Sequence, residues 1–221
     1  GYLIAVLKYF DNTNKPNHSY KMISNVKQDI IFIASSSNFW RYVLTYALIN
    51  GFMISYYAAM PYWFVIHFKM EEQIYSWLAF FPIISYILGS MITSRLLNYL
   101  TMDQLLLIGM LLAVITSICI LLIANWVTPS IVLINIFMCL MSVASGIITP
   151  MANANLMHKF REKVTTLSAM MSGLRVGGAG LLVIITSNIY LNSFWQLGWY
   201  CFSLAILGLL INIFCAKLQS D

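Results

Sequence analysis

Charge is scarce in this sequence. Charged residues make up only 9% of its 221 residues, whereas hydrophobic residues make up 61%. Soluble domains carry about 25% charged residues, so this composition excludes an ordinary soluble domain and indicates an integral membrane protein. The net charge is +5, but the lysines and arginines lie almost wholly in short segments between apolar runs. That pattern is typical of membrane topology, and we expect no nucleic-acid partner.

Side chains for catalysis or metal binding are also few and scattered. His18, His67 and His158 lie in loops far apart, and neither a metalloprotease motif nor a nucleophile elbow is present. The four cysteines lie inside apolar runs without CxxC spacing, so we interpret them as small packing residues. No carboxylate lies deep in an apolar run. We therefore expect neither an enzyme nor a cofactor nor a metal site.

The order of apolar and polar segments predicts an all-α, polytopic membrane protein. Six apolar runs are each near the ~20 residues that span a bilayer. Residues 1–10 read as the end of an earlier membrane helix, because the chain is apolar from Tyr2 to Leu7 without a basic segment ahead. We therefore treat the chain as a fragment. Residues 11–38 read as a cytoplasmic linker with a short amphipathic piece at Val26–Ile33, and 39–221 as a six-helix bundle. The expected spans are 40–66, 74–94, 104–124, 129–151, 165–189 and 195–216.

The positions of the basic residues predict the orientation. Ten of the twelve lysines and arginines fall on one side if the runs alternate across the membrane. They are Lys8, Lys15, Lys21, Lys27, Arg41, Arg95, Lys159, Arg161, Lys163 and Lys217. The opposite loops hold only Lys69, beside Glu71 and Glu72. The positive-inside rule makes the basic side cytoplasmic, so both ends of the chain are expected in the cytoplasm.

Polar side chains recur at helical spacing in three runs, and each set shares one face. The sets are Tyr46, Asn50, Met53, Tyr57 and Pro61; Ser142, Ser145, Thr149 and Asn153; and Ser168, Ser172, Arg175 and Ala179. The first and fourth runs are polar and aromatic on one face, the second and fifth carry small residues, and the third and sixth are aliphatic. Three helices followed by three of matching character predict a 3+3 inverted repeat.

Arg175 is the one charge deep in an apolar run. An arginine at that depth costs at least ~2.5–3.5 kcal/mol on insertion scales, so we interpret it as functional. Gly173 and Gly177 lie on the opposite side of the same helix and predict close packing there. Other interpretations stay open. Arg175 could bond to helix-end carbonyls, the serine and threonine faces could only join helices, and the tyrosines near the outer loop could form an interfacial belt. Asn153 could be a capping group.

The sequence resembles the C-terminal half of a major facilitator superfamily transporter, closest to the Bcr/CflA-type drug efflux group. The resemblance covers the whole chain, from the end of helix 6 through helices 7 to 12. It is carried by Asn38-Phe39-Trp40, Tyr57 to Pro61, Leu88-Gly89-Ser90 to Arg95, Gly146 to Pro150 with Asn153-Ala154-Asn155, and Leu167-Ser168-Ala169. The sequence departs from the family at Arg175, where many relatives have a neutral polar residue, and at Asn98-Tyr99-Leu100, which replaces a Gly-Arg pair.

The resemblance implies a central cavity, alternating access and proton-coupled efflux of small amphipathic solutes, with the proton-carrying acids in an N-terminal six-helix half. It implies a multi-pass protein of the inner membrane whose partners are the lipid bilayer, protons, a small-molecule substrate and that N-terminal half. A buried cation disfavours cationic drugs, so we expect an anionic or zwitterionic substrate. An importer of the same fold and a non-transporting remnant are the alternatives. A membrane enzyme would need an acid or nucleophile within a span.

From the residues and the resemblance together we assign roles to eleven positions. Arg175 senses substrate charge; Tyr46, Asn50 and Tyr57 supply stacking and hydrogen bonds. Ser145, Thr149, Asn153 and Ser172 line the pathway, while Gly146, Pro150 and Pro61 give flexibility.

Overall fold

The computed structural model describes residues 16–61, 64–65, 68–124, 130–189 and 194–217, and it is all-helical, as predicted. The elements in this part of the chain are α2 (Pro16–Ser35), α3 (Ser37–Pro61), α4 (Glu72–Leu96), α5 (Met102–Ala124), α6 (Ile131–Lys159), the short 3₁₀ helix η2 (Arg161–Lys163), α7 (Val164–Ile189) and α8 (Phe194–Lys217). Residues 1–10, expected to end an earlier helix, lie outside the described residues.

Within the described residues, the five helices α4 to α8 are long and apolar enough to cross a membrane. Helix α3 is 25 residues long. Its inward face carries Arg41, Tyr42, Thr45 and Tyr46, all nearly inaccessible. Burial against neighbouring helices compensates for this polarity.

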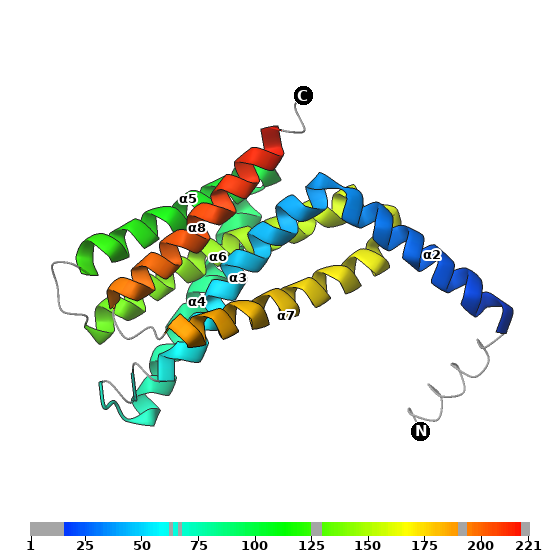
Figure 1. Cartoon of the computed structure of the whole chain (residues 1–221). Helices are drawn as coiled ribbons and strands as arrows, with labels where there is room; N and C mark the ends of the chain where they lie inside the picture. Colours follow the sequence, from blue (N-terminus) through cyan, green and yellow to red (C-terminus); the bar gives the residue numbers. More distant parts are fainter. Residues whose placement is uncertain (1–15, 62–63, 66–67, 125–129, 190–193, 218–221) are drawn as a thin grey trace, which may run out of the picture.

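The helices form one bundle in which α3 and α6 are central (Figure 1). Helix α6 packs against α3, α4 and α5, and α3 packs against α6, α7 and α8. Helix α7 lies along α3, while α2 leaves the end of the bundle and crosses beyond the start of α7 (Figure 1). The contacts of α4 with other long helices are made mainly with α6. One face of the bundle is therefore bordered by α4, α6, α3 and α7.

The segment expected to be a polar linker is largely helical. Only Val26–Ile33 was predicted to be amphipathic, but α2 runs from Pro16 to Ser35. The bundle holds its C-terminal part, because Ile33 is fully buried and the Asp29 carboxylate lies 2.6 Å from Nζ of Lys163. That ammonium also lies 4.2 Å from the centre of the Phe32 ring. These contacts anchor the predicted amphipathic piece to the α6–α7 turn, and the helix begins ten residues before that piece, at Pro16.

A polar cluster joins α3, α5 and α8 through the buried Arg41, the buried Asn212 and the half-exposed Asp103. Nη2 of Arg41 donates to Oδ1 of Asn212 at 2.9 Å and lies 3.4 Å from the Asp103 carboxylate. The hydroxyl of Tyr42 donates to the same carboxylate at 2.7 Å. Arg41 is only 6% exposed, so its charge is held by a carboxylate and an amide instead of water. The cluster orients α3 against α5 and α8.

Helices α4 and α6 each contain an interior proline, and each leaves a carbonyl that the other helix binds. Pro150 has no N–H for the carbonyl of Gly146, and the hydroxyl of Ser90 on α4 donates to that oxygen at 3.0 Å. Pro82 likewise leaves the carbonyl of residue 78 in α4 free, and Nδ2 of Asn135 on α6 donates to it at 3.1 Å. The two polar contacts let both helices continue through proline inside an apolar environment.

Two glycines allow α4 and α6 to approach this closely. A Cβ on Gly146 would lie 2.3 Å from the carbonyl oxygen of Tyr86, and one on Gly89 would lie 2.5 Å from that of Val143. Both neighbours are backbone atoms and cannot move independently of their helices. Helix α6 also continues past the predicted end at 151 to Lys159. Its last turns are anchored by Leu156, which is fully buried.

Candidate functional site

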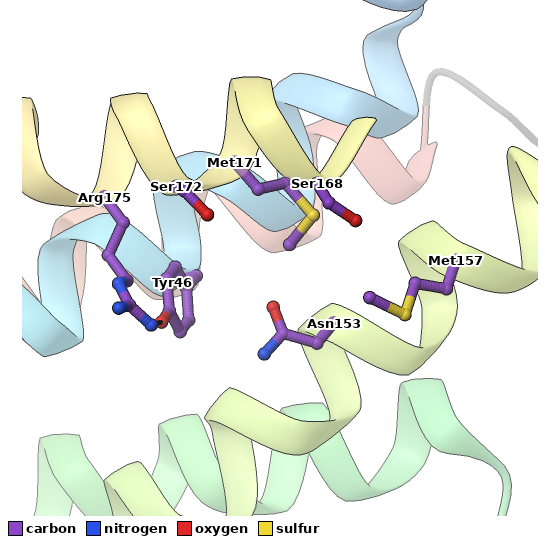
Figure 2. Close-up of a pocket in the computed structure, with 7 residues that line it drawn as sticks. All are labelled: Tyr46, Asn153, Met157, Ser168, Met171, Ser172 and Arg175. Atoms are coloured by element: carbon purple, nitrogen blue, oxygen red, sulfur yellow. Dashed lines mark hydrogen bonds between the residues drawn. The ribbon is translucent and has the colours of Figure 1, made fainter. Parts of the chain in front are cut away.

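A cavity of about 140 Å³ opens between α3, α6 and α7 (Figure 2). It is lined by Tyr46, Asn153, Met157, Ser168, Met171, Ser172 and Arg175. We call it the arginine cavity. Tyr46 comes from the third turn of α3, Asn153 from the last turns of α6, and Arg175 from the middle of α7, about 17 Å from its start at 1.5 Å per residue. The cavity thus lies in the half of the bundle nearest the α6–α7 turn.

Within the part of the chain that the structure describes, one side chain holds the guanidinium of Arg175. Nη1 donates a hydrogen bond of 3.0 Å to the hydroxyl of Tyr46. Among the residues that the structure describes, no carboxylate lies within ion-pair distance of Arg175. Two other cations of the bundle differ in this respect, because Arg41 pairs with Asp103 and Lys163 with Asp29. Arg175 therefore presents an unneutralised positive charge to the cavity.

The neutral groups around this charge suit an anion. Arg175 and the Tyr46 ring approach the cavity from one side and the Asn153 amide from α6 on the other, with Ser172 on the α7 side (Figure 2). Hydroxyl and amide groups donate hydrogen bonds to oxygens, and a guanidinium binds a carboxylate or phosphate through two parallel N–H groups. Met157 and Met171 add polarisable apolar surface. The arrangement can hold a small oxyanion next to an apolar group.

A second cavity of about 220 Å³ lies between α3, α4 and α6. It is lined by Asn50, Met53, Ile54, Tyr57, Ile83, Tyr86 and Ser145. We call it the tyrosine cavity. It begins one helical turn beyond Tyr46 on α3, and Nδ2 of Asn50 donates to Oγ1 of Thr149 at 3.3 Å. That hydrogen bond joins α3 to α6 at the level between the two cavities.

The structure divides the predicted site residues between these cavities. Arg175, Tyr46, Asn153 and Ser172 meet in the arginine cavity, while Asn50, Tyr57 and Ser145 line the tyrosine cavity. Thr149 bonds to Asn50 between them. Gly146 and Pro150 lie at the contact of α4 with α6. Pro61 ends α3, and its side chain lies outside the described residues.

The glycine face of α7 differs from expectation. A Cβ on Gly173 or Gly177 would meet nothing within 4 Å, so no helix of the described chain packs there. Helix α7 instead packs on α3 through the opposite face, where a Cβ on Gly51 would lie 2.0 Å from the Leu182 side chain. Arg175 is exposed, not buried as expected. The spacing of Gly173 and Gly177 identified a helix face without large side chains, but no described helix packs against that face.

Some lining residues were absent from the predicted site. Helical spacing placed Ser168 on the same predicted face as Ser172 and Arg175, but no role in the site was assigned to it. Tyr86 and Ile83 carry no such signal, because they belong to α4 and reach the cavity only through the close approach of α4 to α6.

Comparison with known families assigns this architecture. Residues 2–182 match the family model described as Major Facilitator Superfamily. The chain belongs to the Major Facilitator Superfamily. This superfamily member is therefore a multi-pass membrane transporter of small molecules and not an enzyme. No curated protein and no solved structure matches the chain.

Proposed function

We propose that this superfamily member is the C-terminal half, helices 7 to 12, of a proton-coupled exporter of the Bcr/CflA type, which expels a small amphipathic anion. The N-terminal half supplies the proton-carrying acid, since no acidic residue lies deep in an apolar run of this chain. The protein resides in the inner membrane with both ends of this chain in the cytoplasm. Gly146, Pro150 and Pro61 provide the bending that alternating access requires.

The observation that carries the proposal is the unneutralised guanidinium of Arg175 in a polar cavity. A charge within a membrane-spanning segment pairs with another group or lies in a water-filled pathway. Here the only described hydrogen-bond partner is the neutral hydroxyl of Tyr46, which orients the guanidinium without cancelling its charge. An anionic solute supplies the missing charge each time it binds, and a cationic solute is repelled. This fits a transporter for anionic or zwitterionic solutes.

Transport of anionic and cationic solutes into inside-out vesicles by the native protein tests this. Arg175→Gln should lower anion transport about tenfold or more, because a charge-assisted hydrogen bond contributes about 1.5–3 kcal/mol. Arg175→Lys should retain part of the activity, since it keeps the charge but loses the planar pair of donors. Arg161→Gln, an exposed arginine of η2 outside both cavities, is the matched control. Unchanged kinetics for every anion with Arg175→Gln would refute the proposal.

Two alternatives give different results in the same vesicles. In an importer of the same fold, moving the solute into the vesicles would require a proton gradient opposite in sign to the one that drives export. A non-transporting remnant would show no flux in either direction with any variant. If Arg175 instead pairs with a carboxylate of the N-terminal half, Arg175→Gln would shift the pH dependence of transport equally for anions and cations.

A further inference from the structure

We propose that the tyrosine cavity is a second subsite that binds the aromatic end of the same organic anion whose carboxylate is held by Arg175. This inference rests on the proposed function and deepens it. The ligand class is an aryl-terminated carboxylate whose two ends are separated by a defined length. Nothing in the sequence pattern alone joined α4 to the pathway.

The lining of the tyrosine cavity suits an aromatic group. Tyr57 from α3 and Tyr86 from α4 contribute two rings, and Met53 and Ile83 add apolar side chains. Aromatic rings pair in offset or edge-to-face geometries, and thioethers contact ring edges favourably. None of the described residues that line this cavity is charged. Its volume, about 220 Å³, exceeds that of the arginine cavity, about 140 Å³, which is sized for a small polar group.

The close contact of α4 with α6 forms this subsite. Because residue 146 is glycine, the backbone of α4 at Tyr86 can approach the backbone of α6 closely. A Cβ on residue 146 would lie 2.3 Å from the carbonyl oxygen of Tyr86. This approach brings Tyr86 and Ile83 to the same cavity as Ser145. The subsite is thus part of the helix packing and does not depend on a loop.

The two cavities follow one another along the same two helices. On α3 the arginine cavity is lined at Tyr46 and the tyrosine cavity from Asn50 to Tyr57; on α6 the corresponding positions are Asn153 and Ser145. Asn153 follows Ser145 by eight positions, which corresponds to about 12 Å of helix at 1.5 Å per residue. A ligand that fills both cavities therefore places its carboxylate and its ring about 12 Å apart.

The hydrogen bond between Asn50 and Thr149 lies between the two subsites. Its length of 3.3 Å is at the long end of the range for such bonds, so it is weak. A ligand that spans both cavities passes between these side chains and separates them at the cost of this weak bond, while the Asn50 amide keeps its hydrogen bond of 3.1 Å to the carbonyl of Tyr46. Solutes too short to span both cavities leave the bond between Asn50 and Thr149 intact. Length is therefore a selection criterion of this pathway.

A series of ω-phenylalkanoates, from phenylacetate to 14-phenyltetradecanoate, tests the inference. Binding is measured by titration calorimetry on the native protein in nanodiscs, with the heat of empty nanodiscs subtracted to remove partition into lipid. Each added methylene should tighten binding by up to about fourfold, until the ring reaches the tyrosine cavity at about eight to nine methylenes, because about ten bonds of about 1.2 Å cover the distance between the two subsites. Longer acids should gain nothing further.

Three variants separate this inference from the proposed function. Tyr86→Ala should weaken the long acids about tenfold and leave phenylacetate unchanged. Tyr99→Ala, which removes a tyrosine that is 85% exposed on the α4–α5 turn, should change neither. Arg175→Gln should weaken all members of the series.

The chain-length series and the variants together distinguish three outcomes. A length optimum in the unmodified protein, with weakening of only the long acids by Tyr86→Ala, supports the second subsite. Affinity independent of chain length while Arg175→Gln still weakens every acid would overturn the second subsite and leave the anion site standing. No effect of Arg175→Gln on any acid would overturn both.

Discussion

Replacing Ser90 by alanine tests whether a side chain of α4 compensates for the proline of α6. The Ser90 hydroxyl donates at 3.0 Å to the carbonyl of Gly146, which Pro150 leaves without its helical N–H. Without that donor the oxygen is unsatisfied in an apolar environment. A hydrogen bond between membrane helices contributes about 0.6 kcal/mol on average and up to about 1.7, and an orphaned buried acceptor costs about 1–3 kcal/mol. We expect Ser90→Ala to lower the unfolding free energy by about 1–2 kcal/mol.

The decisive comparison is a double-mutant cycle with Pro150→Ala. Alanine at position 150 restores an N–H that can reach the Gly146 carbonyl within α6. In that background Ser90→Ala should cost about 1 kcal/mol less than in the unmodified protein, because the oxygen keeps a donor. Unfolding free energies are measured by denaturant titration of the native protein in mixed micelles, followed by tryptophan fluorescence.

Ser94→Ala is the matched control. Ser94 is an exposed serine on the same helix, and its hydroxyl donates within α4 to the carbonyl of Met91 at 2.8 Å. Its replacement should change the unfolding free energy by less than about 0.5 kcal/mol. If Ser90→Ala costs the same in the unmodified protein and in the Pro150→Ala variant, the serine does not act through the free carbonyl, and the reasoning would be wrong.

Two further predictions concern packing and charge. Gly146→Ala should destabilise the protein by about 1–3 kcal/mol, because its Cβ would lie 2.3 Å from a backbone carbonyl of α4; Gly173→Ala, where a Cβ meets nothing within 4 Å, should be neutral or slightly stabilising in the same titration. Asp103→Ala removes a half-exposed carboxylate that lies 3.4 Å from the guanidinium of Arg41, whose side chain is 7% exposed. It should cost about 1–3 kcal/mol, because it leaves that buried cation without its counter-charge. Asp29→Ala should cost at most about 1 kcal/mol, because the side chain of Lys163, whose ammonium it leaves unpaired, is 27% exposed. If Gly146→Ala and Gly173→Ala lower the unfolding free energy equally, the argument from close backbone contact would be wrong. If Asp103→Ala and Asp29→Ala lower it equally, the argument from burial of the cation would be wrong.

Several features could be predicted from the sequence because they depend on local geometry. Run length set the approximate places of the six long helices, so that the spans expected at 104–124 and 165–189 correspond to Met102–Ala124 and Val164–Ile189. Helical spacing placed Ser172 and Arg175 on one face, and the structure brings both to one cavity. The scarcity of charge identified Arg175, since a cation in an apolar run is visible without knowing its neighbours. A period of 3.6 residues is a property of one helix alone.

Tertiary structure decided which faces meet. Tyr46 and Arg175 are 129 positions apart, and only the packing of α7 on α3 places their side chains within 3.0 Å. One row of polar residues on α3 was divided into two cavities because α4 crosses α6 at Gly146 and brings Tyr86 to the second of them. Periodicity orients a side chain around its own axis, but the partner of each face depends on how separate helices cross, and those crossings are set by close contacts between residues far apart in the chain.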